Sequence, residues 1–204
     1  MTDKTLDYYE QNAVELSRRY ESTALEALHA LLRQTFSPGD RLLEIGCGSG
    51  RDAATAMAAG FDVCALDGSS SLLQEAIRLH PELAGRLHHL KLPGPLPFAN
   101  ASFAGIFSVA CLMHFNANEL PGIIAEIARV LKPAGKALIS VPAGRSDIDA
   151  NGLDEHGRIF NLMPATSWQK LFAAHGFSTS TGAEEPDSLG RPGIAWVTFV
   201  LQKT

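Results

Sequence analysis

A short apolar run that leads into three closely spaced glycines constrains the fold of this chain more than any other feature. Residues 42–45 are followed by Gly46, Gly48 and Gly50, and then by an alanine-rich helical segment that closes at Gly60. Glycine lets the backbone adopt positive φ angles and approach a ligand closely, and the start of a helix offers free N–H groups. Because three glycines at alternate positions exceed what an ordinary turn needs, the pattern predicts a strand, a ligand-binding turn and a helix.

The rest of the chain repeats this alternation of short apolar runs and helical segments. Strands are expected at residues 42–45, 61–66, 87–90, 105–109, 137–141, 177–181 and 194–201. Strands that alternate with helices of this length form right-handed βαβ units and a mostly parallel sheet. We therefore expect an α/β fold, with the last two strands as an antiparallel pair at one edge.

Helices are expected before the first strand. One helical face is indicated by apolar and aromatic residues at three- and four-residue steps, namely Leu6, Tyr9, Ala13, Leu16 and Tyr20. A second helix is predicted to begin at Thr23, with Glu26 three residues later as in a capping box. The same pattern predicts later helix starts at Ser71 and Thr166. Because the first helical face needs a surface to cover, residues 1–36 are expected to form a helical lid.

Composition limits the partners of the chain. Its 204 residues suit one domain, and 17 Lys+Arg against 22 Asp+Glu leave a net charge of −5. This charge disfavours nucleic-acid phosphates and anionic membranes as partners. The longest apolar stretch, residues 103–115, is too short for the roughly 20 residues that cross a bilayer, and the first residues lack a secretory pattern. We expect a soluble protein that acts on a small molecule.

The three cysteines, Cys47, Cys64 and Cys111, form no CxxC pair. Their odd number and spacing argue against a disulfide framework and against a metal site. A reducing, cytoplasmic location is the expectation that fits them.

An acidic side chain ends the second expected strand. A carboxylate at this place, Asp67, can accept hydrogen bonds from both hydroxyls of a ribose, which a neutral side chain cannot copy. The same acid serves nicotinamide-binding folds. However, the dinucleotide fingerprint G-x-G-x-x-G requires a third glycine where this chain has Arg51.

The glycine turn resembles the first motif of the class I S-adenosylmethionine-dependent methyltransferases, in which an acidic residue, here Glu44, precedes G-x-G-x-G. Residues 131–135 are similar to the L-K-P-G-G turn of that family, with Ala134 at the first glycine. Residues 96–103 are similar to its L-P-F…S-F-D segment, with Ala104 in place of the acid. The resemblance implies a Rossmann-like three-layer sandwich with a seven-stranded, mostly parallel sheet, an antiparallel last strand and additional N-terminal helices.

The resemblance also implies a cofactor, S-adenosylmethionine, which leaves as S-adenosylhomocysteine. Its binding residues would be Glu44, Gly46, Cys47, Gly48, Gly50, Arg51, Asp67, Gly68, Leu92 and Ala110. The glycine loop would wrap the methionine part and Asp67 would hold the ribose. Many relatives hold adenine with an acid after the third strand; this chain has none there, so apolar walls such as Leu90 or Leu92 are expected instead.

The acceptor side is expected in the later part of the chain. Residues 37–142 would form the cofactor-binding core, and residues 143–204 would supply an acceptor-side loop, a helix and the terminal strand pair. Substrate contacts are expected from Tyr20, His114 and Arg158. His114 follows the fourth strand and would act either as a base, which its ordinary pKa near 6.5 allows, or as a lining residue of the pocket.

The predicted function is methyl transfer from S-adenosylmethionine to an O, N or S atom of a small molecule. Two other hypotheses stay open at this point. One is a nicotinamide-dependent oxidoreductase, and the other is a non-catalytic nucleoside-binding protein on the same fold.

Overall fold

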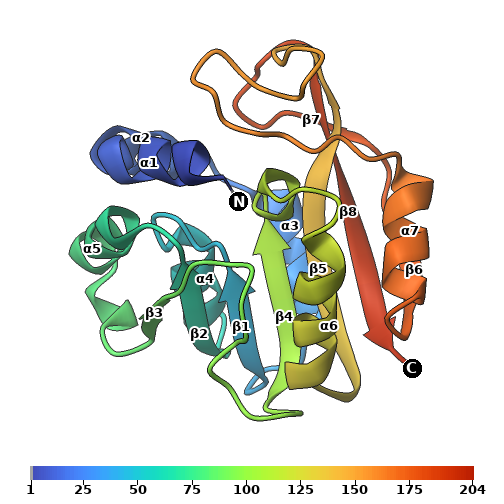
Figure 1. Ribbon diagram of the computed structural model, residues 1–204. Coiled ribbons are helices and arrows are strands. Elements are labelled where there is room, and N and C mark those ends of the chain that lie inside the picture. The colour runs from blue at the N-terminus through green and yellow to red at the C-terminus, as the bar shows by residue number, and fades with distance from the viewer. Residues whose placement is uncertain (1) are drawn as a thin grey trace.

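The protein is described here by a computed structural model, which covers residues 2–204; Met1, part of the expected lid, lies outside the described residues. Its centre is a sheet of eight strands in the order β3-β2-β1-β4-β5-β8-β6, with β7 paired to β8 (Figure 1). The strands are β1 (Arg41–Ile45), β2 (Asp62–Asp67), β3 (Leu87–His89), β4 (Phe103–Val109), β5 (Leu131–Arg145), β6 (Phe177–Thr181), β7 (Glu185–Pro186) and β8 (Ile194–Lys203).

Strands β1 to β5 run parallel, and β8 pairs antiparallel with both β5 and β6. The expected mostly parallel sheet with an antiparallel last strand is therefore confirmed. The expected count of seven strands is one too few, because the two-residue strand β7 forms in the loop before β8. Such a short strand leaves no period-two pattern in the sequence.

The central strand β1 is apolar on both faces because helices cover both sides of the sheet. Leu42 packs with α3 (Glu26–Thr35) and α4 (Arg51–Ala58), while Leu43 packs with α6 (Leu120–Val130) and α7 (Ala165–Ala173). Both leucines are fully buried. The remaining long helix, α5 (Ser70–Leu79), lies beside β2 and β3 (Figure 1). This arrangement is the expected three-layer sandwich.

The N-terminal segment forms two helices, α1 (Asp3–Gln11) and α2 (Ala13–Glu21), where one was expected. They separate at Asn12, whose backbone N–H and side-chain amide both donate to the carbonyl of Tyr8, at 3.1 and 2.8 Å. Both helices lie over the end of the sheet to which the parallel strands point (Figure 1). The Glu10 carboxylate accepts hydrogen bonds from residues 69–71 at the start of α5, which fastens α1 to the core.

The capping patterns misplaced three helix starts. Helix α3 begins at Glu26 without a side-chain cap, and the backbone carbonyl of Thr23 accepts a hydrogen bond from Arg51. Helix α5 is capped by Ser69, whose hydroxyl oxygen accepts from the N–H of Leu72 at 3.1 Å, and not by Ser71. Helix α7 begins one residue before Thr166 and follows a proline. Competing hydroxyls and tertiary contacts thus override the local pattern.

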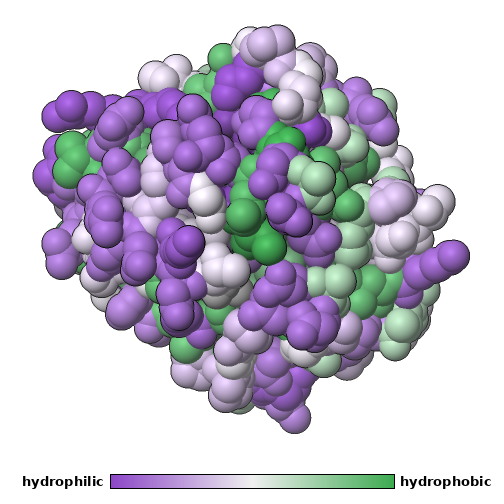
Figure 2. All heavy atoms as spheres, turned by 45° about the horizontal axis from the view of Figure 1, so that its top comes forward, coloured by the Kyte–Doolittle hydropathy of each residue, from purple (hydrophilic) through white to green (hydrophobic). Residues whose placement is uncertain are grey.

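The surface is mostly polar when the carboxyl-end edge of the sheet is turned forward, with a small apolar area near the centre of the view (Figure 2). Among residues 2–204, the exposed large apolar side chains are those of Val14, Ile77 and Leu162. Within the same range, no helix combines the length and the apolar character needed to cross a membrane.

Candidate functional site

A cavity of about 490 Å³ lies at the carboxyl ends of the parallel strands. Residues of α1, α2 and α3 wall one part of it, the loops after β1, β2 and β4 form its floor, and residues 185–191 close the remaining side. This volume lies within the range of about 300–1,000 Å³ that is typical of small-molecule sites. The location at the switch point beside β1 is where open α/β sheets bind ligands.

Most of the residues predicted for the site line this cavity. They are Tyr20, Glu44, Gly46, Cys47, Gly48, Arg51, Asp67, Gly68, Leu92, Ala110, His114 and Arg158. Gly50 is absent from the cavity wall. A Cβ atom at Gly50 would lie 2.6 Å from Cδ1 of Leu83 and 3.1 Å from Cβ of Ala76, and its φ is +82°. Backbone conformation and packing against Leu83 and against Ala76 of α5 are therefore sufficient to explain this glycine.

The glycine loop is held in shape by its neighbours. The N–H groups of Gly46 and Cys47 both donate to the carbonyl of Leu66, at 2.8 and 3.0 Å. The φ of Gly46 is +78°, and a Cβ atom there would lie 2.4 Å from Sγ of Cys111. Gly48 has a φ of +53° and faces the ring of Tyr20. The close approach of Cys111 excludes a side chain at Gly46, and glycine at position 48 adopts its positive φ without strain.

Asp67 organises the loop from the end of β2. Its Oδ2 accepts from the N–H of Gly48 at 2.9 Å, and its Oδ1 accepts from the N–H of Ser69 at 2.8 Å. Desolvation raises the pKa of this carboxyl above its ordinary value, and the two backbone donors oppose the shift. Each oxygen keeps accepting capacity, so a cavity ligand with hydroxyl donors fits this side chain.

Glu44, which lies two residues before the glycine loop, has a buried carboxyl oxygen without a hydrogen-bond partner among the described residues. This oxygen is Oε2, and Glu44 is 1% exposed. Burial raises the pKa of Glu44 well above its ordinary value, and the nearby Asp52 adds to the shift. Buried polar atoms are normally hydrogen-bonded, so a ligand in the cavity that donates a hydrogen bond to this oxygen would explain its position.

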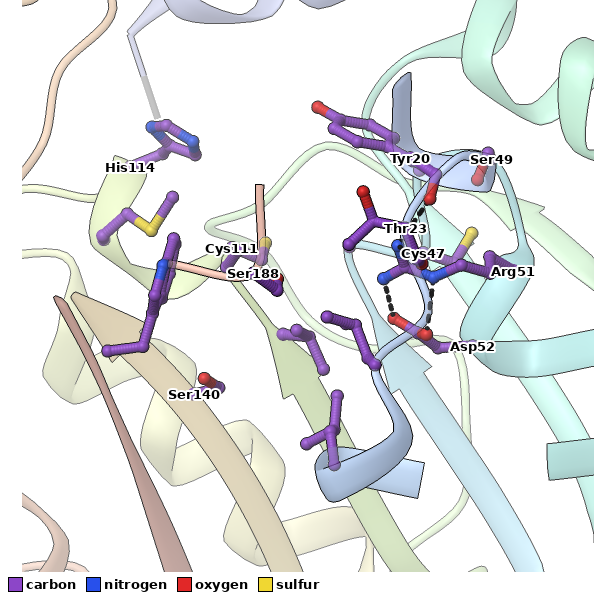
Figure 3. Close-up of a pocket in the computed structure, with 18 of the residues that line it drawn as sticks. Tyr20, Thr23, Cys47, Ser49, Arg51, Asp52, Cys111, His114, Ser140 and Ser188 are labelled. Atoms are coloured by element: carbon purple, nitrogen blue, oxygen red, sulfur yellow. Dashed lines mark hydrogen bonds and ion pairs between the residues drawn. The ribbon is translucent and has the colours of Figure 1, made fainter. Parts of the chain in front are cut away.

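Arg51 ties the N-terminal helices to the core. Its Nη1 donates to the carbonyls of Tyr20 at 2.7 Å and Thr23 at 3.2 Å, while Nε and Nη2 hold Asp52 (Figure 3). Asp52 also bonds His29 of α3 at 2.7 Å. Because these contacts use the donors of Arg51, its position fits a role in fixing the end of α2 beside the glycine loop.

His114 lies on the opposite side of the cavity from Tyr20 and Arg51 (Figure 3). Its Nδ1 is 2.7 Å from the carbonyl oxygen of Ile159, and its Nε2 is 2.8 Å from the hydroxyl of Tyr9. A carbonyl can only accept, so the Nδ1 atom carries the proton and Nε2 accepts from Tyr9. Burial lowers the pKa of His114 to about 3, and the charges of Arg158 and Arg145 act in the same direction. The ring is therefore neutral.

Several cavity residues were not predicted from the sequence. Tyr9 belongs to the helical face that the sequence predicts for residues 6–20, so the face on which its side chain lies could be predicted. Its hydrogen bond with His114 could not. Arg19 also lines the cavity, and its buried Nε has no partner among the described residues. Arg145 and Trp196 also line the cavity, and neither lies in a pattern that marks a site.

The loop before β8 closes the cavity through one acidic side chain. Asp187 accepts from Arg191 at 2.6 and 2.9 Å and from Nε1 of Trp196 at 2.8 Å. The side chain of Asp187 is 2% exposed and that of Arg191 is 29% exposed, so the carboxylate is shielded from water and the guanidinium is partly exposed. The contacts hold residues 185–191 beside the cavity.

Several known proteins that are similar to this chain are methyltransferases by name. Residues 17–181 match the family described as "Methyltransferase domain". An O-methyltransferase of Pyrenophora dematioidea is 30% identical over 164 residues, which are 76% of this chain and 61% of that protein. The biotin biosynthesis bifunctional protein BioHC of Cellvibrio japonicus is 36% identical over 129 residues, which are 61% of this chain and 23% of that protein. The chain thus spans less than two thirds of the length of these curated relatives.

The fold is also that of a solved methyltransferase structure. The 1,6-didemethyltoxoflavin-N1-methyltransferase of Burkholderia thailandensis, crystallised with 1,6-didemethyltoxoflavin and S-adenosylhomocysteine, superimposes with a TM-score of 0.79. The superposition covers 98% of this chain and 88% of that chain, at 20% sequence identity. At this identity the likeness is one of fold.

Proposed function

The chain belongs to the methyltransferase-domain family of class I S-adenosylmethionine-dependent enzymes, and from this premise we propose that it methylates an O, N or S atom of a small-molecule acceptor. The observation that carries the proposal is the cavity, which has the glycine loop and Asp67 on one side and His114 on the other. Family membership favours this activity over the nicotinamide-dependent alternative.

The cavity wall fits S-adenosylmethionine. The two positive-φ glycines, Gly46 and Gly48, give close access to backbone, and the buried atoms without partners belong to Glu44 and Arg19. We assign these four residues to the methionine part, where Arg19 would face the carboxylate. We assign Asp67 to the ribose hydroxyls, and the cavity-lining Leu90 and Leu92 to the adenine.

When bound, S-adenosylmethionine supplies a methyl group on a positively charged sulfur, an activated donor that many nucleophiles attack without further help. The chain's own contribution is position and exclusion of water. Helices α1 and α2 and residues 185–191 close the cavity on two sides. The neutral His114 presents Nε2 as a hydrogen-bond acceptor, which can orient a hydroxyl or amine hydrogen of the acceptor. Tyr9 occupies that position in this structure.

Charge and cysteine chemistry support the class of acceptor and its setting. The net charge of −5 disfavours a nucleic-acid acceptor. The cysteines at 47, 64 and 111 are free thiols, which is typical of a reducing compartment. We infer a small-molecule acceptor and a cytoplasmic setting.

Isothermal titration of the full chain with S-adenosylmethionine, S-adenosylhomocysteine and NADH tests the proposal. We expect binding of both adenosyl compounds at one site per chain, and NADH binding at least 100-fold weaker. Binding of NADH without binding of the adenosyl compounds would overturn the assignment. Formation of S-adenosylhomocysteine with a panel of small acceptors then separates an enzyme from a binding protein.

A further inference from the structure

Three arginines line the acceptor side of the cavity: Arg145, Arg158 and Arg191. From their geometry we propose that the acceptor is a small organic anion, whose carboxylate binds Arg145 and Arg158 and whose apolar body rests among the aromatic side chains beside them. The inference rests on the proposed function and specifies its substrate class.

Each of these arginines holds an aspartate but keeps donors free. Arg145 holds Asp147 through Nε and Nη2, and Arg158 holds Asp154 through the same two atoms. The Nη1 atom of Arg145 has no partner among the described residues, and Nη1 of Arg158 has only the hydroxyl of Tyr9 at 3.5 Å. A guanidinium has five N–H donors, so both side chains can bind a further oxyanion.

The two aspartates lie outside the cavity wall, whereas the arginines form part of it. A ligand in the cavity would therefore meet the guanidinium groups of Arg145 and Arg158 and not the carboxylates that pair with them. Arg191 differs, because its partner Asp187 lines the cavity together with it. For this reason we assign the anion to Arg145 and Arg158 alone.

Burial and stacking hold both guanidinium groups in place. The side chains of Arg145 and Arg158 are 2% and 8% exposed. They lie 3.7 and 5.3 Å from the ring centroid of Phe160, so both groups share one neighbourhood. Arg158 also lies 4.5 Å from the ring of Tyr8. A charge fixed in a low-dielectric wall acts more strongly on a ligand than a mobile surface charge.

The field of these cations reaches the position where the acceptor would react. After burial, the charges of Arg158 and Arg145 lower the pKa of His114, and the charge of Asp154 opposes each of them with a smaller effect. A positive field repels an ammonium group and attracts a carboxylate. The apolar part of the ligand would contact Met113, Phe115 and Trp196, which line the same cavity.

Matched probes test the inference on the full chain saturated with S-adenosylhomocysteine. Benzoate, benzamide and benzylamine share a ring and differ in charge. By titration with NMR detection, we expect benzoate to bind at least 10-fold more tightly than benzamide, and benzylamine to bind more weakly than both. Equal or tighter binding of benzamide or benzylamine, or no binding of benzoate, would overturn the inference.

Variants locate the anion. Arg145→Gln and Arg158→Gln should each weaken benzoate binding at least 5-fold. Arg145→Lys, which keeps the positive charge, should weaken benzoate binding less than Arg145→Gln does. Arg78→Gln is the control, because Arg78 also holds a carboxylate, that of Glu75, but lies outside the cavity. Unchanged benzoate binding in Arg145→Gln contradicts the inference even if Arg158→Gln does not fold. Each variant's affinity for S-adenosylhomocysteine reports on the cofactor site separately, so failure of the proposed function is distinguishable.

Discussion

The hydroxyl of Tyr9 in α1 lies 2.8 Å from Nε2 of His114, which follows β4, and so joins the first helix of the chain to the acceptor side of the cavity. A second bond runs between the same regions, from the N–H of Ile159 to Oγ1 of Thr5 at 3.0 Å. Helix α1 therefore contacts both the His114 ring and the loop that carries Arg158. Through these two bonds, one helix links residues from distant parts of the sequence at the cavity wall.

Replacing Tyr9 by phenylalanine should destabilise the protein. The substitution leaves the buried Nε2 of His114 without a donor, which costs about 1–3 kcal/mol. We expect the free energy of unfolding in urea to fall by that amount. Tyr8→Phe is the matched control, since Tyr8 is the adjacent residue and its ring stacks on His156 without a hydrogen bond from its hydroxyl among the described residues. Equal losses in the two variants would show that the Tyr9 hydroxyl adds nothing.

The buried His114 should make stability depend on pH. Burial lowers its pKa to about 3, whereas the unfolded chain has an ordinary value near 6.5. Between these values the unfolded state binds the extra proton, so stability decreases as the pH falls. Proton linkage predicts that the free energy of unfolding falls by about 2 kcal/mol between pH 7 and pH 5 because of His114. Urea denaturation at both pH values should show that loss reduced in His114→Gln; an identical pH dependence in the two proteins would contradict it.

The sequence indicated the positions of the glycine loop and of Asp67 in the cavity wall, but not the pairing of Tyr9 with His114, for a physical reason. The glycine loop and Asp67 each sit at the end of a strand, and the parallel strands bring these ends together by topology alone. The pair of Tyr9 and His114 is different, because its geometry depends on how a helix packs over a distant loop. Likewise Arg145 and Arg158 acquire their direction from stacking on Phe160, a contact that no local pattern specifies.

Helix boundaries were less predictable than strand order. Glu10 bonds the residues at the start of α5, so a tertiary contact shares that helix end with the capping Ser69. Arg51 takes the carbonyl of Thr23 in the same way. A lone capping pattern misses such competition, whereas alternating strands and helices specify the sheet through many residues at once.

Asp67→Asn should weaken cofactor binding. The carboxylate accepts from two backbone N–H groups, and an amide nitrogen in place of one oxygen accepts nothing. A hydrogen bond to a charged group contributes about 1.5–3 kcal/mol. We expect the affinity for S-adenosylhomocysteine, measured calorimetrically, to fall by roughly 10-fold or more.

The matched control for that measurement is Asp62→Asn. Asp62 lies on the same strand, is exposed and bonds Arg86 outside the cavity. Its substitution should leave the affinity unchanged. An Asp67→Asn protein that binds S-adenosylhomocysteine as tightly as the Asp62→Asn protein would remove Asp67 from the cofactor site.

Ala134→Gly should stabilise the protein. Ala134 has a φ of +57° near the start of β5, where the pairing with β4 is irregular and where the resembled family carries glycine. A left-handed conformation costs a side-chain-bearing residue roughly 1–2 kcal/mol, and glycine avoids that strain. Glycine also loses more conformational freedom on folding, which offsets part of the gain. Since the methyl group is exposed, little packing is lost, and we expect the free energy of unfolding to rise by about 0.5–1 kcal/mol. The control, Ala173→Gly at the exposed last residue of α7, should lower it, because glycine loses more conformational freedom on folding than alanine does. If urea denaturation finds both variants destabilised alike, the positive φ of Ala134 carries no strain.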